Sequence, residues 1–214
     1  MIKAIIWDLD GTLLNTIDDL AASVNFALTK YNLPAKTVGE VKKAVGNGVN
    51  KLIERCTPNG QANINFAQIL QAFKDHYSQN SAVKTAPYPE ICKTLKELKA
   101  RGYKLAVVSN KFESAVKELC QKYFQNTFDV IIGESAKIKR KPSPDMLFEA
   151  IKLLQIKPQE IYFIGDSEVD IQTARNAQIQ FLSALWGFRD KETLLANGAT
   201  NFLINPQEIF NFIK

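Results

Sequence analysis

Short apolar runs alternate with helical patterns over most of this 214-residue chain, and this alternation limits the possible folds more than any other feature. Strands are expected at 4–7, 104–108, 128–132, 161–164 and 180–184, with a short last strand at 202–204. Helices are expected near 90–100, 112–123, 144–155, 168–176 and 207–213. Strands separated by helices imply right-handed crossovers and a parallel sheet covered on both faces. The sequence therefore predicts an α/β fold with a doubly wound, Rossmann-like parallel sheet.

Residues 15–83 interrupt this alternation, because only helical patterns are found there. Apolar residues repeat at three and four positions over 41–45, 49–56 and 66–77, and Gly46-Asn47-Gly48 separates two of these stretches. Thr16 and Asp19 have the spacing of a capping box, which predicts a further helix that begins after Thr16 and precedes these three stretches. We expect an all-helical cap inserted after the first strand, over 15–83, with 1–14 and 84–214 forming the α/β core.

Two carboxylates follow the first expected strand directly, in the segment Asp8-Leu9-Asp10-Gly11-Thr12. Ligands of open α/β sheets bind beyond the carboxyl ends of the strands. Asp8 and Asp10 point the same way if the chain stays extended, and they repel each other there. Folding does not require such a pair, which favours a cation site and chemistry at this edge. A plain strand-end turn is the alternative interpretation, since Asp and Gly are turn formers.

Three more polar segments follow later strands: Ser109-Asn110-Lys111, Lys139-Arg140-Lys141-Pro142 and Gly165-Asp166-Ser167-Glu168-Val169-Asp170. A hydroxyl at the N-terminus of a helix suits an anion, which favours Ser109 as a binding residue. Asn110 with Glu113 also has the spacing of a helix cap, and the two roles are compatible. Ser167 with Asp170 would form a capping box with or without a metal.

These four segments together resemble the four motifs of the phosphatase branch of the haloacid dehalogenase superfamily, in the right order and over essentially the whole chain. The resemblance implies that Asp8 is a nucleophile and Asp10 a general acid and base. It also implies that Ser109 holds a phosphoryl oxygen and that Lys141 neutralises charge. Gly11, Thr12 and Asn110 are expected to bind the substrate.

The same resemblance implies Mg²⁺ as the cofactor, because a hard cation prefers oxygen ligands. A carboxylate oxygen of Asp8, the backbone carbonyl of Asp10 and Asp166 are the expected ligands. Asp170 is expected to be an outer partner of the metal or of the lysine. The expected reaction is hydrolysis of a phosphate monoester through an aspartyl-phosphate.

Two segments narrow the resemblance to phosphoglycolate phosphatases, namely Val45-Gly46-Asn47-Gly48 and Trp186-Gly187-Phe188-Arg189. This likeness implies 2-phosphoglycolate as substrate. The expected contacts from the insertion are Gly46, Asn47, Gly48, Lys51 and Arg55. Pyrophosphate, sugar phosphates and nucleotides are alternative substrates. The chain departs from the pattern at Glu90, where a glycine often follows Pro-Tyr-Pro.

Composition limits the other classes of function. The net charge is +5, but the lysines are scattered and no nucleic-acid signature accompanies them, so we expect no nucleic-acid partner. Three widely spaced cysteines indicate reduced thiols, and no apolar run is long enough for a membrane span. We therefore expect a cytoplasmic monomer or homodimer that acts on a small phosphorylated metabolite. A phospho-accepting receiver-type signalling domain also uses an acid pair and a lysine, but it would be much shorter.

Overall fold

Parallel strands in the order β5-β4-β1-β6-β7-β8 form the main sheet of the computed structural model, which describes residues 1–213. Their bounds are β1 Ala4–Trp7, β4 Lys104–Phe112, β5 Val130–Glu134, β6 Ile161–Gly165, β7 Gln180–Ala184 and β8 Phe202–Leu203. The central strand β1 is completely buried and pairs with β4 on one side and β6 on the other. The expected doubly wound parallel sheet is confirmed.

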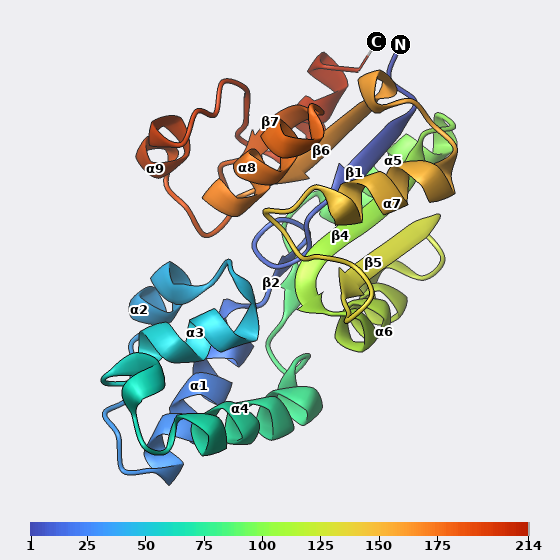
Figure 1. Ribbon diagram of the computed structural model, residues 1–214. Coiled ribbons are helices and arrows are strands. Elements are labelled where there is room, and N and C mark those ends of the chain that lie inside the picture. The colour runs from blue at the N-terminus through green and yellow to red at the C-terminus, as the bar shows by residue number, and fades with distance from the viewer. Residues whose placement is uncertain (214) are drawn as a thin grey trace. The chain divides into compact units, whose positions relative to one another are not determined.

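Helices cover this sheet on both faces, as Figure 1 shows, with α7 and α8 on one face and α5 on the other. The bounds are α5 Ile91–Ala100, α6 Glu113–Phe124, α7 Asp145–Leu154, α8 Glu168–Ala177 and α9 Lys191–Ala196. Apolar side chains of α7 and α8, such as Leu147 and Ala174, form one buried cluster with Ile6 and Phe163 of the strands. Burial of this apolar surface is the main force that holds the helices on the sheet.

Two short elements at the C-terminal end differ from expectation. α9 was not predicted, because six residues hold too little periodicity to be recognised; Asp190 caps it by accepting a hydrogen bond from the Thr193 N–H at 2.8 Å. The helix expected at 207–213 is instead a 3₁₀ helix over Pro206–Asn211. Its start is capped by the Asn205 side chain, which accepts from the Gln207 N–H.

The chain divides into two compact units, which we call the core unit (Met1–Leu14 with Pro87–Lys214) and the helical unit (Asn15–Ala86). The helical unit contains α1 Ile17–Lys30, α2 Val38–Ala44, α3 Gly48–Cys56, the 3₁₀ turn Gly60–Ala62 and α4 Phe66–Asn80. The short strands β2 Leu14–Asn15 and β3 Ala86–Pro87 pair where the chain passes between the units. The expected all-helical insertion is confirmed. Within residues 1–213, none of the helices combines the length and apolar character needed to cross a membrane.

The capping box expected at the start of α1 is wrong. Thr16 makes no cap hydrogen bond through its side chain, and its buried hydroxyl has no partner. Asp19 instead accepts hydrogen bonds from the backbone N–H groups of 83–85 and from the Thr85 hydroxyl, at 2.8–3.1 Å. Its carboxylate fixes the returning chain against α1, a long-range contact that local spacing does not reveal.

The sheet places two motif-bearing loops at its topological switch point. The chain leaves β1 toward β4 and β5, then crosses back to β6 and continues to β7 and β8. The strand order reverses between β1 and β6, and ligands of such sheets bind at the carboxyl ends of the strands on either side of the reversal. Asp8 follows β1 and Asp166 follows β6, so the two acids flank this position.

Candidate active site

Asp8 and Asp10 lie in a tight turn at the carboxyl end of β1. The Asp8 N–H donates to the carbonyl of Ile164 at 2.8 Å, which continues the pairing of β1 with β6. Gly11 has a φ of +89°, and a Cβ there would lie 2.3 Å from Oδ2 of Asp166. Glycine is therefore required for the turn to approach Asp166.

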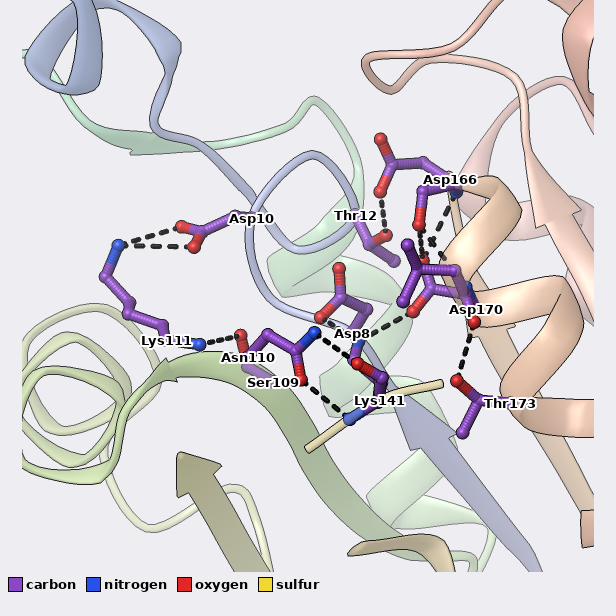
Figure 2. Close-up of polar contacts among 12 residues, drawn as sticks. Asp8, Asp10, Thr12, Ser109, Asn110, Lys111, Lys141, Asp166, Asp170 and Thr173 are labelled. Atoms are coloured by element: carbon purple, nitrogen blue, oxygen red, sulfur yellow. Dashed lines mark hydrogen bonds and ion pairs between the residues drawn. The ribbon is translucent and has the colours of Figure 1, made fainter. Parts of the chain in front are cut away.

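Lys141 joins two acids at the centre of the site, as Figure 2 shows. Its Nζ lies 2.7 Å from Oδ1 of Asp8 and 2.6 Å from Oδ1 of Asp170, and its side chain is only 3% exposed. Burial alone would lower the pKa of Lys141, but Asp170 and Asp8 outweigh that effect and raise it. Lys141 is therefore a fixed buried cation against the predicted nucleophile.

Asn110 positions Lys141 through its backbone. The Lys141 N–H donates to Oδ1 of Asn110, and Nδ2 of Asn110 donates to the Lys141 carbonyl, both at 2.9 Å. The expected cap of α6 by Asn110 is wrong, because the helix begins at Glu113, its N-cap residue is Phe112 and no side-chain hydrogen bond caps it. The amide instead joins the segment after β4 to the segment that carries Lys141.

Ser109 is buried at the edge of the same site, but not at a helix N-terminus. β4 extends to Phe112, four residues beyond the expected end, and its register with β5 shifts between Val108 and Phe112. The Ser109 hydroxyl accepts a hydrogen bond from the Lys111 N–H at 3.3 Å. Any anion held by Ser109 would therefore be bound at an irregular strand end rather than at the start of α6.

Asp166 is held from two sides and is 1% exposed. The Thr12 hydroxyl donates to its Oδ1 at 3.0 Å, and the Phe188 N–H donates to its Oδ2 at 2.7 Å. Burial raises the pKa of Asp166 to about 7, and Asp170 acts in the same direction. Thr12, expected to bind substrate, therefore also orients an acid of the predicted metal site.

Asp170 contacts the lysine and also caps its own helix. Its Oδ1 pairs with Lys141, while its Oδ2 accepts hydrogen bonds from the Ser167 N–H at 3.2 Å and from the Ser167 hydroxyl at 2.5 Å. The capping box expected at the start of α8 is confirmed, since the Ser167 hydroxyl also accepts from the Asp170 N–H. Asp170 can therefore be both the partner of Lys141 and a member of the capping box with Ser167, the two roles that the sequence left open.

The charges of this cluster fit a divalent cation. Carboxylate oxygens of Asp8, Asp166 and Asp170 all lie within 4.8 Å of one another, and all three residues are buried. Burial raises the pKa of Asp8. The negative charges of Asp170 and Asp166 raise this pKa further, whereas the positive charge of Lys141 lowers it. Three ionised carboxylates and one ammonium leave two negative charges, which a buried site disfavours unless a cation balances them. An oxygen-rich site of this kind suits Mg²⁺.

Lys111 is a site residue that the sequence reasoning missed. Its Nζ lies 3.0 Å from Oδ1 and 3.3 Å from Oδ2 of Asp10, and its side chain is 4% exposed. Figure 2 shows this pair on one side of the site, with Asp166 and Asp170 on the other. The signal available in the sequence was its place directly after Ser109-Asn110, in the second motif.

The residues expected to bind substrate from the insertion belong to the helical unit. Gly46 and Gly48 have φ values of +132° and +77°, a region that favours glycine, and Asn47 is the N-cap residue of α3. Lys51 pairs with Glu54 at 2.8 Å, and Nη1 of Arg55 donates to the Ala44 carbonyl at 2.9 Å. Both cations therefore already have partners within the helical unit.

Comparison with known proteins agrees with the geometry. The sequence profile of the haloacid dehalogenase-like hydrolase family matches residues 5–184. The chain is 34% identical to a phosphoglycolate phosphatase of Aquifex aeolicus, over 87% of this chain and 86% of that protein. It is 31% identical to a phosphoglycolate phosphatase of Psychrobacter arcticus, over 98% of this chain and 91% of that protein.

A solved structure extends the likeness to the fold. The crystal structure of a candidate phosphoglycolate phosphatase from Lactobacillus delbrueckii subsp. bulgaricus superposes with a TM-score of 0.95 at 34% identity, covering 99% of this chain and 98% of that one. The profile match, the relatives and this structure span the sheet, the insertion and all four motifs. The chain belongs to the haloacid dehalogenase-like hydrolase family.

Proposed function

We propose that this protein is a Mg²⁺-dependent phosphatase that hydrolyses a small phosphate monoester through an aspartyl-phosphate, with 2-phosphoglycolate as its preferred substrate. The observation that carries the proposal is the buried cluster of Asp8, Asp166 and Asp170, in which the ammonium of Lys141 contacts Asp8 and Asp170. Phosphoryl transfer depends mainly on positioning and on neutralisation of charge, and this cluster supplies both.

Asp8 and Asp166, with the backbone carbonyl of Asp10, are the groups that would hold the Mg²⁺. When bound, the ion would neutralise phosphoryl charge and orient the phosphate toward Asp8. Thr12 and Phe188 keep the Asp166 carboxylate in one orientation by donating to both of its oxygens. Asp170 would act mainly through Lys141, which it contacts directly.

Asp8 is the proposed nucleophile. One of its carboxylate oxygens attacks phosphorus, the bond from phosphorus to the leaving oxygen breaks, and an aspartyl-phosphate forms. Lys141 stabilises the charge on the transferring group from within 2.7 Å of Asp8, and the Ser109 hydroxyl is the proposed ligand of a phosphoryl oxygen.

Asp10 is the proposed general acid and base. It donates a proton to the leaving alkoxide in the first step. In the second step it accepts a proton from the water that attacks phosphorus, the bond to Asp8 breaks, and inorganic phosphate leaves. Lys111 lies against the Asp10 carboxylate and holds it at the site.

The names of the relatives support 2-phosphoglycolate as the substrate. Lys51 and Arg55 are the proposed partners of the substrate carboxylate. Either would exchange or share its present contact, to Glu54 or to the Ala44 carbonyl, when the substrate binds. The insertion would in this way select among esters that share the same phosphoryl group.

A panel of phosphate esters tests the proposal. Purified protein is incubated with 2-phosphoglycolate, glycerol phosphate, a sugar phosphate, a nucleoside monophosphate and pyrophosphate, with Mg²⁺ and with a chelator. The expected result is release of phosphate that requires Mg²⁺ and has its highest kcat/KM on 2-phosphoglycolate. A preference for pyrophosphate would contradict the assignment of 2-phosphoglycolate as the substrate. Absence of turnover on every ester would contradict the assignment of phosphatase activity.

A further inference from the structure

Glu168 and Arg189 form a two-point ion pair beside the acid cluster. Nε of Arg189 lies 2.7 Å from Oε2 of Glu168, and Nη2 lies 3.2 Å from Oε1. The side chains are 30% and 11% exposed, respectively. Two parallel contacts between a guanidinium and a carboxylate fix the relative orientation of both groups more tightly than a single contact would.

The segment that ends at Arg189 lies directly on Asp166. The Phe188 N–H donates to Oδ2 of Asp166, and the Trp186 indole N–H donates to the Thr12 carbonyl at 2.9 Å. Gly187 packs so closely that a Cβ there would lie 2.2 Å from Cβ of Asp166. The segment 186–189 therefore sets the position of the Asp166 side chain, directly through Phe188 and through its contact with the Thr12 backbone.

The ion pair completes a closed cycle of contacts that includes Asp166. Asp166 is followed two residues later by Glu168, the first residue of α8. Glu168 binds Arg189, whose neighbour Phe188 donates back to Asp166. Loops that follow strands move more than the strands themselves. The Glu168–Arg189 ion pair, which we call the tether, therefore limits how far the Phe188 N–H can move from the Asp166 carboxylate.

We propose that Glu168 and Arg189 are positioning residues that hold the segment 186–189 against Asp166 and thereby set the affinity of the site for Mg²⁺. The inference rests on the metal ligands assigned under the proposed function. Outer partners that orient a ligand change metal affinity by about 10- to 100-fold when they are removed. Neither residue is assigned a contact with the substrate.

Isothermal titration of the metal-free, full-length protein with MgCl₂ alone tests this tether without any substrate. The variants are Glu168→Gln, Arg189→Gln, their combination and Arg189→Lys. Lys3→Met is the control, because it removes an ion pair with Glu160 of 2.6 Å from outside the site. Thermal unfolding of each variant without metal shows whether it is folded.

Positioning and simple electrostatics predict opposite results for one variant. If charge alone mattered, Arg189→Gln would strengthen Mg²⁺ binding by removing a nearby cation, and Glu168→Gln would weaken it. The tether predicts that both single variants bind Mg²⁺ about 10-fold more weakly. The double variant should bind no more weakly than the weaker single variant, because each change breaks the same contact. Arg189→Lys should lose less, and Lys3→Met should match the wild type.

Unchanged or tighter binding by Arg189→Gln would overturn the tether, and so would additive losses in the double variant. If Arg189→Gln does not fold, Arg189→Lys decides: wild-type affinity in that variant overturns the proposal. A wild-type protein that binds no Mg²⁺ would overturn the tether and the metal assignment together. A protein that shows the expected affinities but hydrolyses no phosphate ester would overturn the proposed function and leave the tether supported.

Discussion

The ammonium of Lys111 lies 3.0 Å from Oδ1 and 3.3 Å from Oδ2 of Asp10, so one buried lysine holds both oxygens of the proposed general acid. The other buried lysine of the site, Lys141, contacts Asp8 at 2.7 Å. Each acid of the first motif thus has its own cation, which offsets the repulsion expected between two carboxylates two residues apart.

Lys111→Met should slow the step that depends on the placement of Asp10. A displacement of about 1 Å in a catalytic group costs up to roughly 100-fold in rate, so we expect a loss of about 10- to 100-fold in kcat/KM on alkyl phosphates. Steady-state kinetics on glycerol phosphate and on p-nitrophenyl phosphate measure this loss. Lys111→Arg should recover part of the activity, and equal losses on both substrates would contradict a role through Asp10.

Asp10→Asn should harm alkyl phosphates far more than aryl phosphates. An alkoxide needs a proton as it leaves, whereas p-nitrophenolate needs little help, and general acid catalysis contributes about 10²- to 10⁴-fold. The readout is the ratio of kcat/KM values for the two substrates, compared with the wild type, because kcat/KM reports the first step and hydrolysis of the aspartyl-phosphate is common to both substrates. A variant that loses kcat/KM in the same proportion on both substrates would point to lost metal or lost folding rather than to a lost acid.

Mg²⁺ should stabilise the protein more at about pH 8 than at about pH 6. Burial raises the pKa of Asp166 from 3.8 to about 7, so the folded metal-free protein binds a proton that the unfolded chain has released. The stability of the metal-free protein therefore falls as the pH rises from the unfolded pKa of 3.8 to the folded pKa of about 7. Above the folded pKa, the ionised Asp166 carboxylate is available to Mg²⁺. Melting temperatures with Mg²⁺ and with a chelator measure the effect, and an Mg²⁺ shift independent of pH would contradict it.

Replacement of Lys51 or Arg55 by Met should reduce the preference for a substrate that carries a carboxylate. An ion pair in a water-poor site contributes about 1–3 kcal/mol, or roughly 10- to 100-fold in kcat/KM. The measurement compares 2-phosphoglycolate with a neutral ester of similar size, and Lys30→Met serves as a control in the same unit. If neither Lys51 nor Arg55 changes the ratio, the carboxylate is bound elsewhere.

The sequence predicted the sheet and the helical insertion well, because both depend on patterns that extend over many residues. β7 occurs at the expected 180–184, and β1 at the expected 4–7. Short elements were missed for the opposite reason, since α9 and the paired dipeptides β2 and β3 contain too few residues for a pattern. Glu90, noted as a departure, has a φ of +65°, the left-handed conformation in which glycine is favoured.

The expected acids also came together, because parallel strands end at one edge of a sheet. Asp8, Asp166 and Asp170 lie in one buried cluster although the sequence separates the first two by the whole helical unit. Contacts of single side chains were harder to predict. Asn110 bonds to the backbone of Lys141, 31 residues away, and Asp19 to residues 64–66 positions away. Such pairs depend on the folded chain, and local spacing suggested helix caps in both cases.

Detection of a phosphoryl group on Asp8 is the most direct test of the proposed reaction. The protein is mixed with an aryl phosphate and Mg²⁺, quenched in acid during turnover, digested and analysed by mass spectrometry. Asp10→Asn serves as a second sample, because slower activation of water should let the intermediate accumulate. The account predicts one added phosphoryl group on the peptide that contains Asp8, and none in Asp8→Asn, which should also lack activity. Turnover that persists in Asp8→Asn, or a phosphoryl group on another residue, would contradict it.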